Sequence, residues 1–308
     1  MNSKTKAAGL SIVSNSSLII MKIIVGIATG SVSIISEAIH STIDLTASLI
    51  SFFSIKISSK PADMEHPYGH GKFEDVSGVI EGVLILIASI FIIFKSIEKL
   101  LSPGNGIPSA AGFIVMLVSS VVNFSISKIL YNIARREDSM ALKADALHLR
   151  TDVYTSLGVG VGLFLIWITG LESLDPLIAI LVSIFILKEA FSLIKSAFNP
   201  LVDVRLSDSD IQKIKNVLSE YSKAFCEFHR LRTRKSGNVR YIDPHLVFPN
   251  DMHVKKAHDI CTKIEDTLSA SLANTETMIH IESCDNDCKN CNFKSNSNCI
   301  EDYNKKNG

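Results

Sequence analysis

Six long apolar segments, separated by short polar stretches, occupy the first two-thirds of the chain. A membrane-spanning helix needs roughly 20 mainly apolar residues, and each segment reaches that length. The intervening stretches, such as "KPADMEHPYGHGK" and "TGLESLDP", are rich in Pro, Gly and charged residues, which end helices. The pattern predicts six membrane-spanning helices, at residues 7–29, 32–57, 76–101, 108–131, 144–168 and 172–198.

The pattern near residue 200 changes to that of a water-soluble domain. Residues 207–222 predict an amphipathic helix that starts with a capping box of Ser207 and Asp210. Two strand-like runs follow, "EFHRLRTR" and "VRYIDPHLVF", then a helix over 252–272 and a third run, "TMIHIES". This αββαβ order is similar to the ferredoxin-like plan of metallochaperones. Pro244 inside the second run predicts an edge strand or a bulge.

Composition agrees with a membrane protein. Hydrophobic residues make up 47% of the 308-residue chain, and the mean hydropathy is +0.28, which is high for a soluble protein. The chain has 31 basic and 31 acidic residues, so no net charge favours nucleic acid as a partner. We therefore expect an α-helical membrane protein with three parts: a six-helix transmembrane domain at 1–203, a cytoplasmic ferredoxin-like α/β domain at 204–283 and a Cys-rich tail at 284–308.

Basic residues lie mostly on one side of the predicted bundle. Cytoplasmic loops of membrane proteins retain Lys and Arg. The loops around Gly30, Asn105 and Glu172 nearly lack them, so we expect both termini on the opposite, cytoplasmic side. The basic residues on the side of the N-terminus are Lys4, Lys6, Lys60, Lys72, Arg135, Arg136 and Lys143.

Two of the apolar segments each carry a His and an Asp four residues apart, His40 with Asp44 and His148 with Asp152. Residues at this spacing share one helix face. Two imidazoles and two carboxylates are enough for a tetrahedral shell around Zn²⁺, and one divalent ion or two protons cancel their charge of −2. Hydroxyl or carbonyl partners inside the bundle are the structural alternative, although ionisable residues within membranes usually serve a function. The pairs predict a metal site that permits electroneutral exchange with protons.

A second group of donors lies between the second and third predicted helices. Asp63, His66 and His70 are embedded in a segment rich in Pro and Gly. Three such donors in a tight loop can close on one metal ion, with water or an outside ligand in the fourth position. A solvated polar loop is the alternative interpretation.

The soluble domain contains five of the nine histidines. His280 and Glu282 are two apart on a predicted strand and therefore share a face, where a carboxylate can bridge two ions. Dispersed histidines are more often core or surface residues, and His253 has no partner in this pattern. The predicted strands and helix carry His229, His245, His258 and His280.

Together these motifs resemble the cation diffusion facilitator family of divalent-metal/proton antiporters. The resemblance covers about residues 7–283 and is carried by the two membrane pairs, the loop "PADMEHPYGHGKFE", the junction "NPLVD" and the cytoplasmic "FHRLRTRKSG". It implies a homodimer in the lipid bilayer that exports a divalent cation in exchange for protons by alternating access. Zn²⁺ is the expected ion, with Fe²⁺, Co²⁺, Mn²⁺ and Cd²⁺ as alternatives.

The resemblance also implies roles for individual residues. The membrane pairs match the family's transport site, and the loop triad matches its loop site. Lys72 and Asp203 fall where the family has a charge interlock near the dimer junction. His40 replaces the Asp of many bacterial members, which implies a narrower, zinc-type selectivity. The family's cytoplasmic cluster, whose metal ions help to hold two subunits together, corresponds to His229, His245, His258, His280 and Glu282, the last of which is often Asp in similar proteins.

The tail adds four cysteines in the spacing C-x3-C-x2-C-x7-C, on which the family resemblance says nothing. In a reducing cytoplasm this spacing predicts a four-thiolate site for Zn²⁺ or an iron–sulfur cluster. A disordered tail with free thiols is the alternative. The four residues are Cys284, Cys288, Cys291 and Cys299.

Three functional classes fit the sequence: a secondary transporter, an integral-membrane metalloenzyme and a metal-sensing scaffold. The chain has no Walker motif or kinase signature, so ATP bound by this chain is not the energy source. An enzyme keeps one coordination position open for its substrate, whereas the paired His and Asp residues suggest a closed shell. We therefore expect a secondary active transporter, not an enzyme, in the inner (plasma) membrane.

Overall fold

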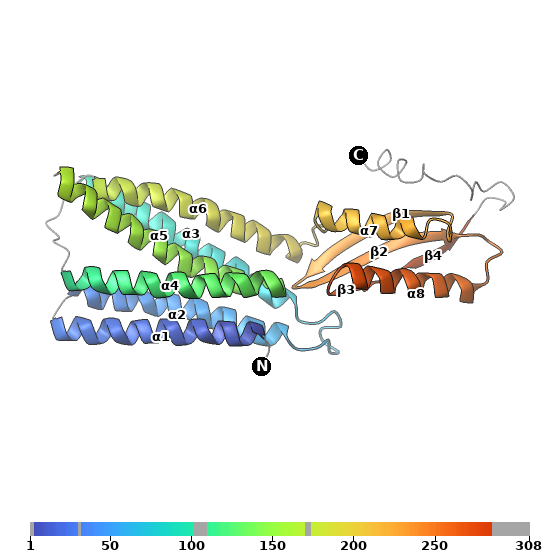
Figure 1. Cartoon of the computed structure of the whole chain (residues 1–308), viewed down its shortest axis with the longest axis horizontal. Coiled ribbons are helices and arrows are strands. Elements are labelled where there is room, and N and C mark those ends of the chain that lie inside the picture. The colour runs from blue at the N-terminus through green and yellow to red at the C-terminus, as the bar shows by residue number, and fades with distance from the viewer. Residues whose placement is uncertain (1–2, 30–31, 102–109, 170–173, 285–308) are drawn as a thin grey trace. The chain divides into compact units, whose positions relative to one another are not determined.

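The computed structural model describes residues 3–29, 32–101, 110–169 and 174–284. The chain forms two compact units that divide after Leu201 (Figure 1). Each unit is described by itself.

In the described part of the chain, six long helices form the bundle of the first unit, one for each predicted apolar segment (Figure 1). Most extend further than predicted, because polar turns at their ends continue the helix. They are α1 (Ser3–Thr29), α2 (Val32–Ser58), α3 (Lys72–Leu101), α4 (Ala110–Glu137), α5 (Met140–Thr169) and α6 (Leu174–Leu201). Among the described residues, four stretches are long and apolar enough to cross a membrane: Ser3–Ala28, Lys72–Glu98, Leu117–Glu137 and Pro176–Leu201.

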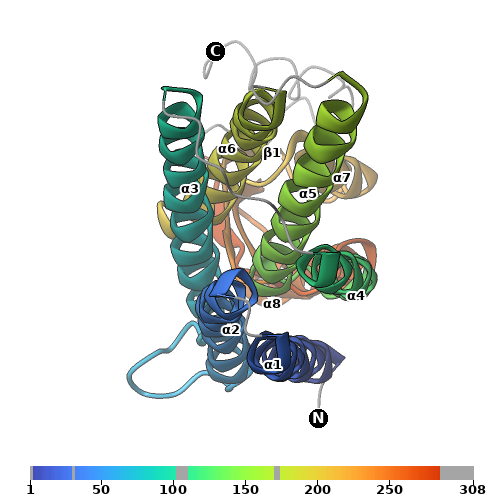
Figure 2. The same ribbon diagram turned by 90° about the vertical axis from the view of Figure 1, so that its left-hand side faces the viewer.

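Close helix pairs build this bundle, which Figure 2 shows along its axis. The most extensive pairings join α3 with α6, α1 with α2, and α4 with α5. Two glycines of α3, one turn apart, allow the close approach of α6. A Cβ on Gly82 would lie 2.6 Å from Cγ1 of Ile194, and one on Gly78 would lie 2.8 Å from Cγ of Met140 at the start of α5. Small residues at this spacing are a common device for packing membrane helices.

One end of the bundle is held together by a single buried carboxylate, Glu74 on α3. Its Oε1 lies 2.6 Å from Nζ of Lys4 on α1 and accepts a hydrogen bond of 2.8 Å from the Ser58 hydroxyl of α2. Its Oε2 accepts a hydrogen bond from Ser139, which directly precedes α5. The Glu74 and Lys4 side chains are 2% and 7% exposed, so this ion pair is little screened by water. Four helices are therefore joined at this end.

The second unit is an α/β domain in the predicted order, with its last strand in two pieces. The N-cap predicted for its first helix is confirmed, because Oγ of Ser207 accepts a hydrogen bond from the amide of Asp210. The second helix starts after His253, whose imidazole caps the amide of Lys255. The elements are α7 (Asp208–Glu220), β1 (Glu227–Ser236), β2 (Val239–Phe248), α8 (Val254–Ser271), β3 (Thr275–Thr277) and β4 (His280–Ser283).

Strand β2 is the centre of the sheet. It pairs antiparallel with β1 on one side and parallel with β3 and β4 on the other. The apolar faces of α7 and α8 pack on the sheet, and the core includes Ile214, Leu218, Ile242, Leu246 and Ile264, all fully buried. Because one face of β2 is buried, its pairing register with the neighbouring strands is fixed. The register in turn determines which side chains of β1 and β4 lie next to those of β2.

Pro244 lies within this central strand, so of the two alternatives predicted from it, an edge strand or a bulge, the edge strand does not apply. The predicted bulge is present, however, because the β1 register shifts between His229 and Arg232, opposite Pro244. On the other side of β2, the gap between β3 and β4 falls opposite the same residue. Pro244 has no amide hydrogen to donate, so it removes a ladder hydrogen bond to one of the two neighbouring strands at this position.

Candidate metal centres

The first centre lies inside the helical unit, between α2 and α5. Nε2 of His148 lies 3.2 Å from Oδ1 of Asp44, and one ligand atom from each of Asp44, His148 and Asp152 lies within 4.8 Å of the other two. The side chains of His148 and Asp44 are 12% and 10% exposed. The structure thus brings together three of the four residues predicted for the transport site.

The surroundings of this centre come from α2, α4 and α5. His40 lies on α2, one turn before Asp44, and its side chain is outside the described residues. Nδ2 of Asn123 on α4 donates a hydrogen bond of 3.4 Å to Oδ2 of Asp152. Nδ1 of His148 is buried and has no hydrogen-bond partner among the described residues. Asn123 therefore orients one carboxylate, while His148 keeps a free ring nitrogen.

The second centre is the predicted loop triad, which the structure also brings together. Oδ1 of Asp63 lies 3.5 Å from Nδ1 of His66, and its Oδ2 lies 3.4 Å from Nε2 of His70. Gly69 adopts φ 76°, a left-handed conformation that closes the turn between the two histidines. The amide of His66 donates to the Asp63 carboxylate, and this hydrogen bond lowers the pKa of Asp63. The triad is therefore preorganised with an ionised carboxylate.

The third centre is a row of histidines across the sheet of the second unit. His245 on β2 is paired in register with His229 on β1 and with His280 on β4. Glu282 contacts all three, with its carboxylate oxygens 2.7 Å from Nδ1 of His245, 3.0 Å from Nε2 of His229 and 3.8 Å from Nε2 of His280. The hydrogen bond from His245 is the main reason that the pKa of Glu282 is lowered.

Other predicted residues lie apart from these centres. His258 is exposed on α8 and does not belong to the group formed by His229, His245 and Glu282. Lys72 begins α3 in the first unit. Asp203 belongs to the second unit, where its carboxylate lies 3.6 Å from Nη1 of Arg234. The charge interlock of Lys72 with Asp203 stays a prediction.

The predicted tail site lies mostly outside the described residues. Cys288, Cys291 and Cys299 belong to the undescribed part of the tail, so the four-thiolate site stays a prediction. Cys284 is described. Its amide donates a hydrogen bond of 2.8 Å to the carbonyl of Phe248, and its thiol is free.

Sequence reasoning assigned no role to several buried polar residues of the first unit. Asp145 on α5 accepts a hydrogen bond from Ser48 on α2, one turn from Asp44. Both carboxylate oxygens of Glu81 on α3 are buried without a hydrogen-bond partner among the described residues. Lys22 on α1 is buried and donates to the Ser41 hydroxyl. The signal that could have found them is the cost of placing an ionisable residue inside an apolar segment.

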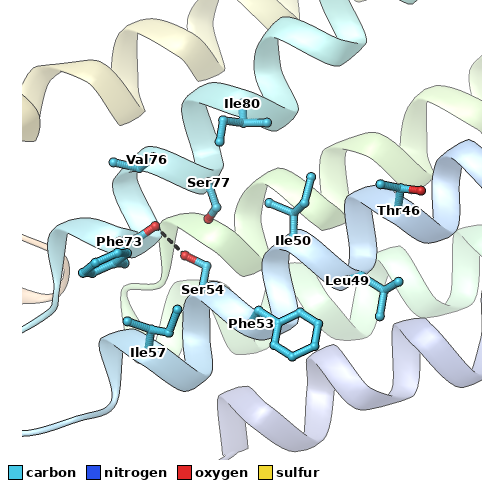
Figure 3. A pocket seen from close by; sticks show the side chains of 10 residues that line it. All are labelled: Thr46, Leu49, Ile50, Phe53, Ser54, Ile57, Phe73, Val76, Ser77 and Ile80. Carbon is cyan, nitrogen blue, oxygen red and sulfur yellow. Dashed lines mark hydrogen bonds between the residues drawn. The ribbon is translucent and has the colours of Figure 1, made fainter.

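A groove of about 350 Å³ lies between α2 and α3 (Figure 3). Its lining is almost wholly apolar and includes Leu49, Ile50, Phe53 and Ile80. At one end the Ser54 hydroxyl donates to the carbonyl of Phe73 (Figure 3). An apolar wall offers no ligands to replace the water shell of an ion, so this groove is not a route for cations.

The fold and the first centre define a helical membrane protein with a buried cluster of His and Asp side chains that could hold a cation, and comparisons with known proteins identify its family. Residues 9–202 match the cation efflux transmembrane domain, and residues 206–284 match the cytoplasmic domain of cation efflux proteins. The chain belongs to the cation diffusion facilitator family. It is therefore a cation efflux transporter, not an enzyme, with a helical transmembrane domain and a cytoplasmic domain that supports dimerisation.

Individual relatives agree with this assignment. An uncharacterized transporter of Synechocystis, sll1263, is 35% identical over 254 residues, which are 82% of this chain and 82% of the relative. The cation-efflux pump FieF of Escherichia fergusonii is 30% identical over 267 residues, covering 87% and 88% of the two chains. FieF of Yersinia pestis (strain Pestoides F) is 31% identical over 280 residues, covering 91% and 93%.

Proposed function

We propose that this chain exports Zn²⁺ from the cytoplasm in exchange for protons. The observation that carries the proposal is the first centre, where Asp44, His148 and Asp152 converge inside the helical unit within 4.8 Å of one another. His40, one turn from Asp44, supplies the fourth ligand. In this proposal all six helices cross the inner (plasma) membrane, both termini are cytoplasmic, and two copies form a homodimer.

The charges of the site explain why metal and protons exchange. Asp44 and Asp152 contribute two negative charges, and imidazole ligands bind metal in their neutral form. One divalent cation cancels this charge, as two protons do. An uncompensated charge inside the membrane is costly, since an Asp at the centre of a membrane helix costs roughly 2.5–3.5 kcal/mol. The site is therefore stable when it holds metal or protons, and unstable when it holds neither.

The donor set favours zinc. Imidazole and carboxylate ligands in a four-coordinate shell suit Zn²⁺. Sites of this kind also bind Fe²⁺, Co²⁺ and Mn²⁺, and selectivity among these ions depends on geometry as well as on ligand type. Cd²⁺ is a further candidate substrate. The loop triad and the cytoplasmic cluster bind the same ion outside the transport route, and metal in the cytoplasmic cluster stabilises the dimer.

The decisive test measures transport in proteoliposomes that contain a zinc-sensitive dye. With a pH gradient across the liposome membrane, we expect zinc uptake by the wild type and none above background in Asp44→Ala. Glu98→Gln is the matched control, since Glu98 is an exposed acid of α3 that pairs with Lys95. Uptake that survives in Asp44→Ala would contradict the site assignment, and uptake that does not respond to the pH gradient would contradict proton coupling.

A second comparison tests the ion. Uptake of Zn²⁺, Fe²⁺, Co²⁺, Mn²⁺ and Cd²⁺ is measured with the wild type and with His40→Asp. Replacing an imidazole by a carboxylate makes the site harder and more negative, so we expect the variant to transport a wider range of ions. Equal selectivity of the two proteins would show that His40 does not set the preference.

A further inference from the structure

A small cavity of about 130 Å³, lined by both charged and apolar side chains, lies between α4, α5 and α6. Helix α5 packs against both α4 and α6 (Figure 1). The charged residues that line the cavity are Lys143 and Arg150 on α5 and Glu189 on α6. Their charges sum to one positive charge.

The two cations are held in this cavity without an acidic partner. The guanidinium of Arg150 lies over the ring of Tyr131 on α4, with its Cζ 4.9 Å from the ring centroid. Within the described parts of the chain, neither Arg150 nor Lys143 forms an ion pair, and neither is paired with Glu189. A cation–π contact orients the guanidinium but does not neutralise it. Both cations therefore remain available to an anion.

The height of the cavity along the bundle indicates where that anion comes from. Helix α4 ends at Glu137 and α5 starts at Met140. With a rise of about 1.5 Å per residue, Lys143 lies about 5 Å and Arg150 about 15 Å from the start of α5. A helix of 30 residues is about 45 Å long, whereas the hydrocarbon layer is about 30 Å thick. The first turn of α5, with Lys143, is therefore at the level of the lipid headgroups. Arg150 lies deeper, between His148 and Asp152 along the helix, but helical side chains point back toward the N-terminus, so its long side chain reaches toward the membrane surface and lines the same cavity as Lys143.

We propose that this cavity binds the phosphate headgroup of an anionic membrane phospholipid. Lys143 and Arg150 contact the phosphate, Tyr131 holds the guanidinium in place, and the exposed apolar residues of α4 and α6, such as Phe124 and Phe191, contact the acyl chains. Basic pockets between transmembrane helices near the membrane surface favour anionic lipids. Glu189 opposes the anion and limits the affinity. The site is on the face of α5 that does not carry the transport residues, so it is independent of the metal centres.

Native mass spectrometry of the full chain tests the proposal, with protein released from micelles that contain equal amounts of phosphatidylglycerol and phosphatidylcholine. We expect the wild type to retain phosphatidylglycerol preferentially. Arg150→Gln should reduce this preference about fivefold, which corresponds to about 1 kcal/mol per basic residue near a membrane surface. Lys143→Gln should act in the same direction. Glu189→Gln should increase the preference, because it removes the only acid that lines the cavity in the described structure.

Lys56→Gln is the matched control, since Lys56 is an exposed basic residue of α2 that does not line the cavity. Equal retention of both lipids by the wild type would overturn the proposal. An equal loss in Lys56→Gln and Arg150→Gln would do the same, because it would indicate diffuse surface attraction. Displacement of the lipid by millimolar inorganic phosphate would assign the site to free phosphate instead. Should Arg150→Gln fail to fold, the opposite responses of Lys143→Gln and Glu189→Gln still decide.

Discussion

Two of the centres use the same kinds of side chain in different proportions. They are the first centre, between α2 and α5, which we call the membrane centre, and the third centre, on the sheet, which we call the cytoplasmic centre. Two carboxylates and one imidazole meet between α2 and α5 among the described residues, whereas one carboxylate and three imidazoles meet on the sheet. The membrane residues Asp44 and His148 are 10% and 12% exposed, but Glu282 is 30% and His280 63% exposed. The centre with less water therefore has more negative charge.

This difference follows from the cost of an unbalanced charge. A divalent ion inside the helical unit needs two negative charges nearby, because water is not there to screen it. A divalent ion on the sheet keeps part of its hydration, so neutral imidazoles suffice. Under the proposed function, the membrane centre exchanges one divalent ion for two protons, and the cytoplasmic centre binds metal reversibly as the metal concentration changes.

Removing one imidazole from each centre gives the largest expected contrast. We expect His148→Gln to lower zinc uptake in proteoliposomes at least about 100-fold, because a ligand is lost from the transport site. His245→Gln should lower uptake less than about tenfold, because the sheet lies outside the transport route. Comparable losses in both variants would show that the cytoplasmic centre is part of the route.

The next largest effect is expected on the zinc affinity of the cytoplasmic centre. Glu282→Gln removes the one carboxylate that contacts all three histidines of the sheet, and we expect zinc affinity of the cytoplasmic centre to fall roughly tenfold. Isothermal titration of the full chain, with the membrane centre disabled by Asp44→Ala, measures it. Glu276→Gln, an exposed acid on β3, is the matched control and should leave the affinity unchanged.

Removing the hydrogen bond that orients Asp152 should have a smaller effect on zinc uptake. Asn123 donates a hydrogen bond to Asp152, so Asn123→Ala should lower zinc uptake about fivefold, as expected for a hydrogen bond of about 1 kcal/mol. Asn216→Ala is the control, because the Asn216 side chain is in α7 and accepts a hydrogen bond from Gln212 instead. Unchanged uptake in Asn123→Ala would show that Asp152 needs no such support.

The acid dependence of stability gives the smallest effect. The pKa of Glu282 is lowered in the folded domain by the hydrogen bond from His245, so the ionised form is the stabilised one. Its contribution is present at neutral pH, above the unfolded value, and is lost as the pH falls through the lowered folded value. In metal-free protein, Glu282→Gln should lower the melting temperature at neutral pH by about a degree and leave it unchanged at a pH below the lowered pKa of Glu282. An equal shift at both pH values, measured by calorimetry, would contradict this linkage.

Much of the fold could be predicted from the sequence, because the spacing of hydrophobic residues indicates which face of a helix or strand is buried. The positions of α1 to α6 and the cap at Ser207 follow from such local signals. Pro244 shows the limit. Its missing amide hydrogen predicts a disturbed ladder, but whether the strand lies at the edge depends on β3 and β4, which come from residues more than 30 positions away.

The candidate sites, like the elements of the fold, were predictable from the sequence where their residues are close together along the chain, and not where they come from distant elements. Spacing within one helix or loop was enough to group Asp63, His66 and His70, whose donors the structure places together. The row of His229, His245 and His280 could not be derived from spacing, because it depends on the register of three strands. Asn123 was missed because an amide in an apolar helix carries no charge, and its contact with Asp152 is between two helices.

The buried carboxylate of Glu74 has a mechanical consequence. Because it joins the ends of α1, α2 and α3 to the start of α5, these helices cannot separate there without exposing an unpaired charge. That end is then a fulcrum, and the 30 residues of α3 form a lever about 45 Å long. A tilt of about 5° would move the far end of such a lever by about 4 Å, which is more than the diameter of a water molecule, while Glu74 stays in place.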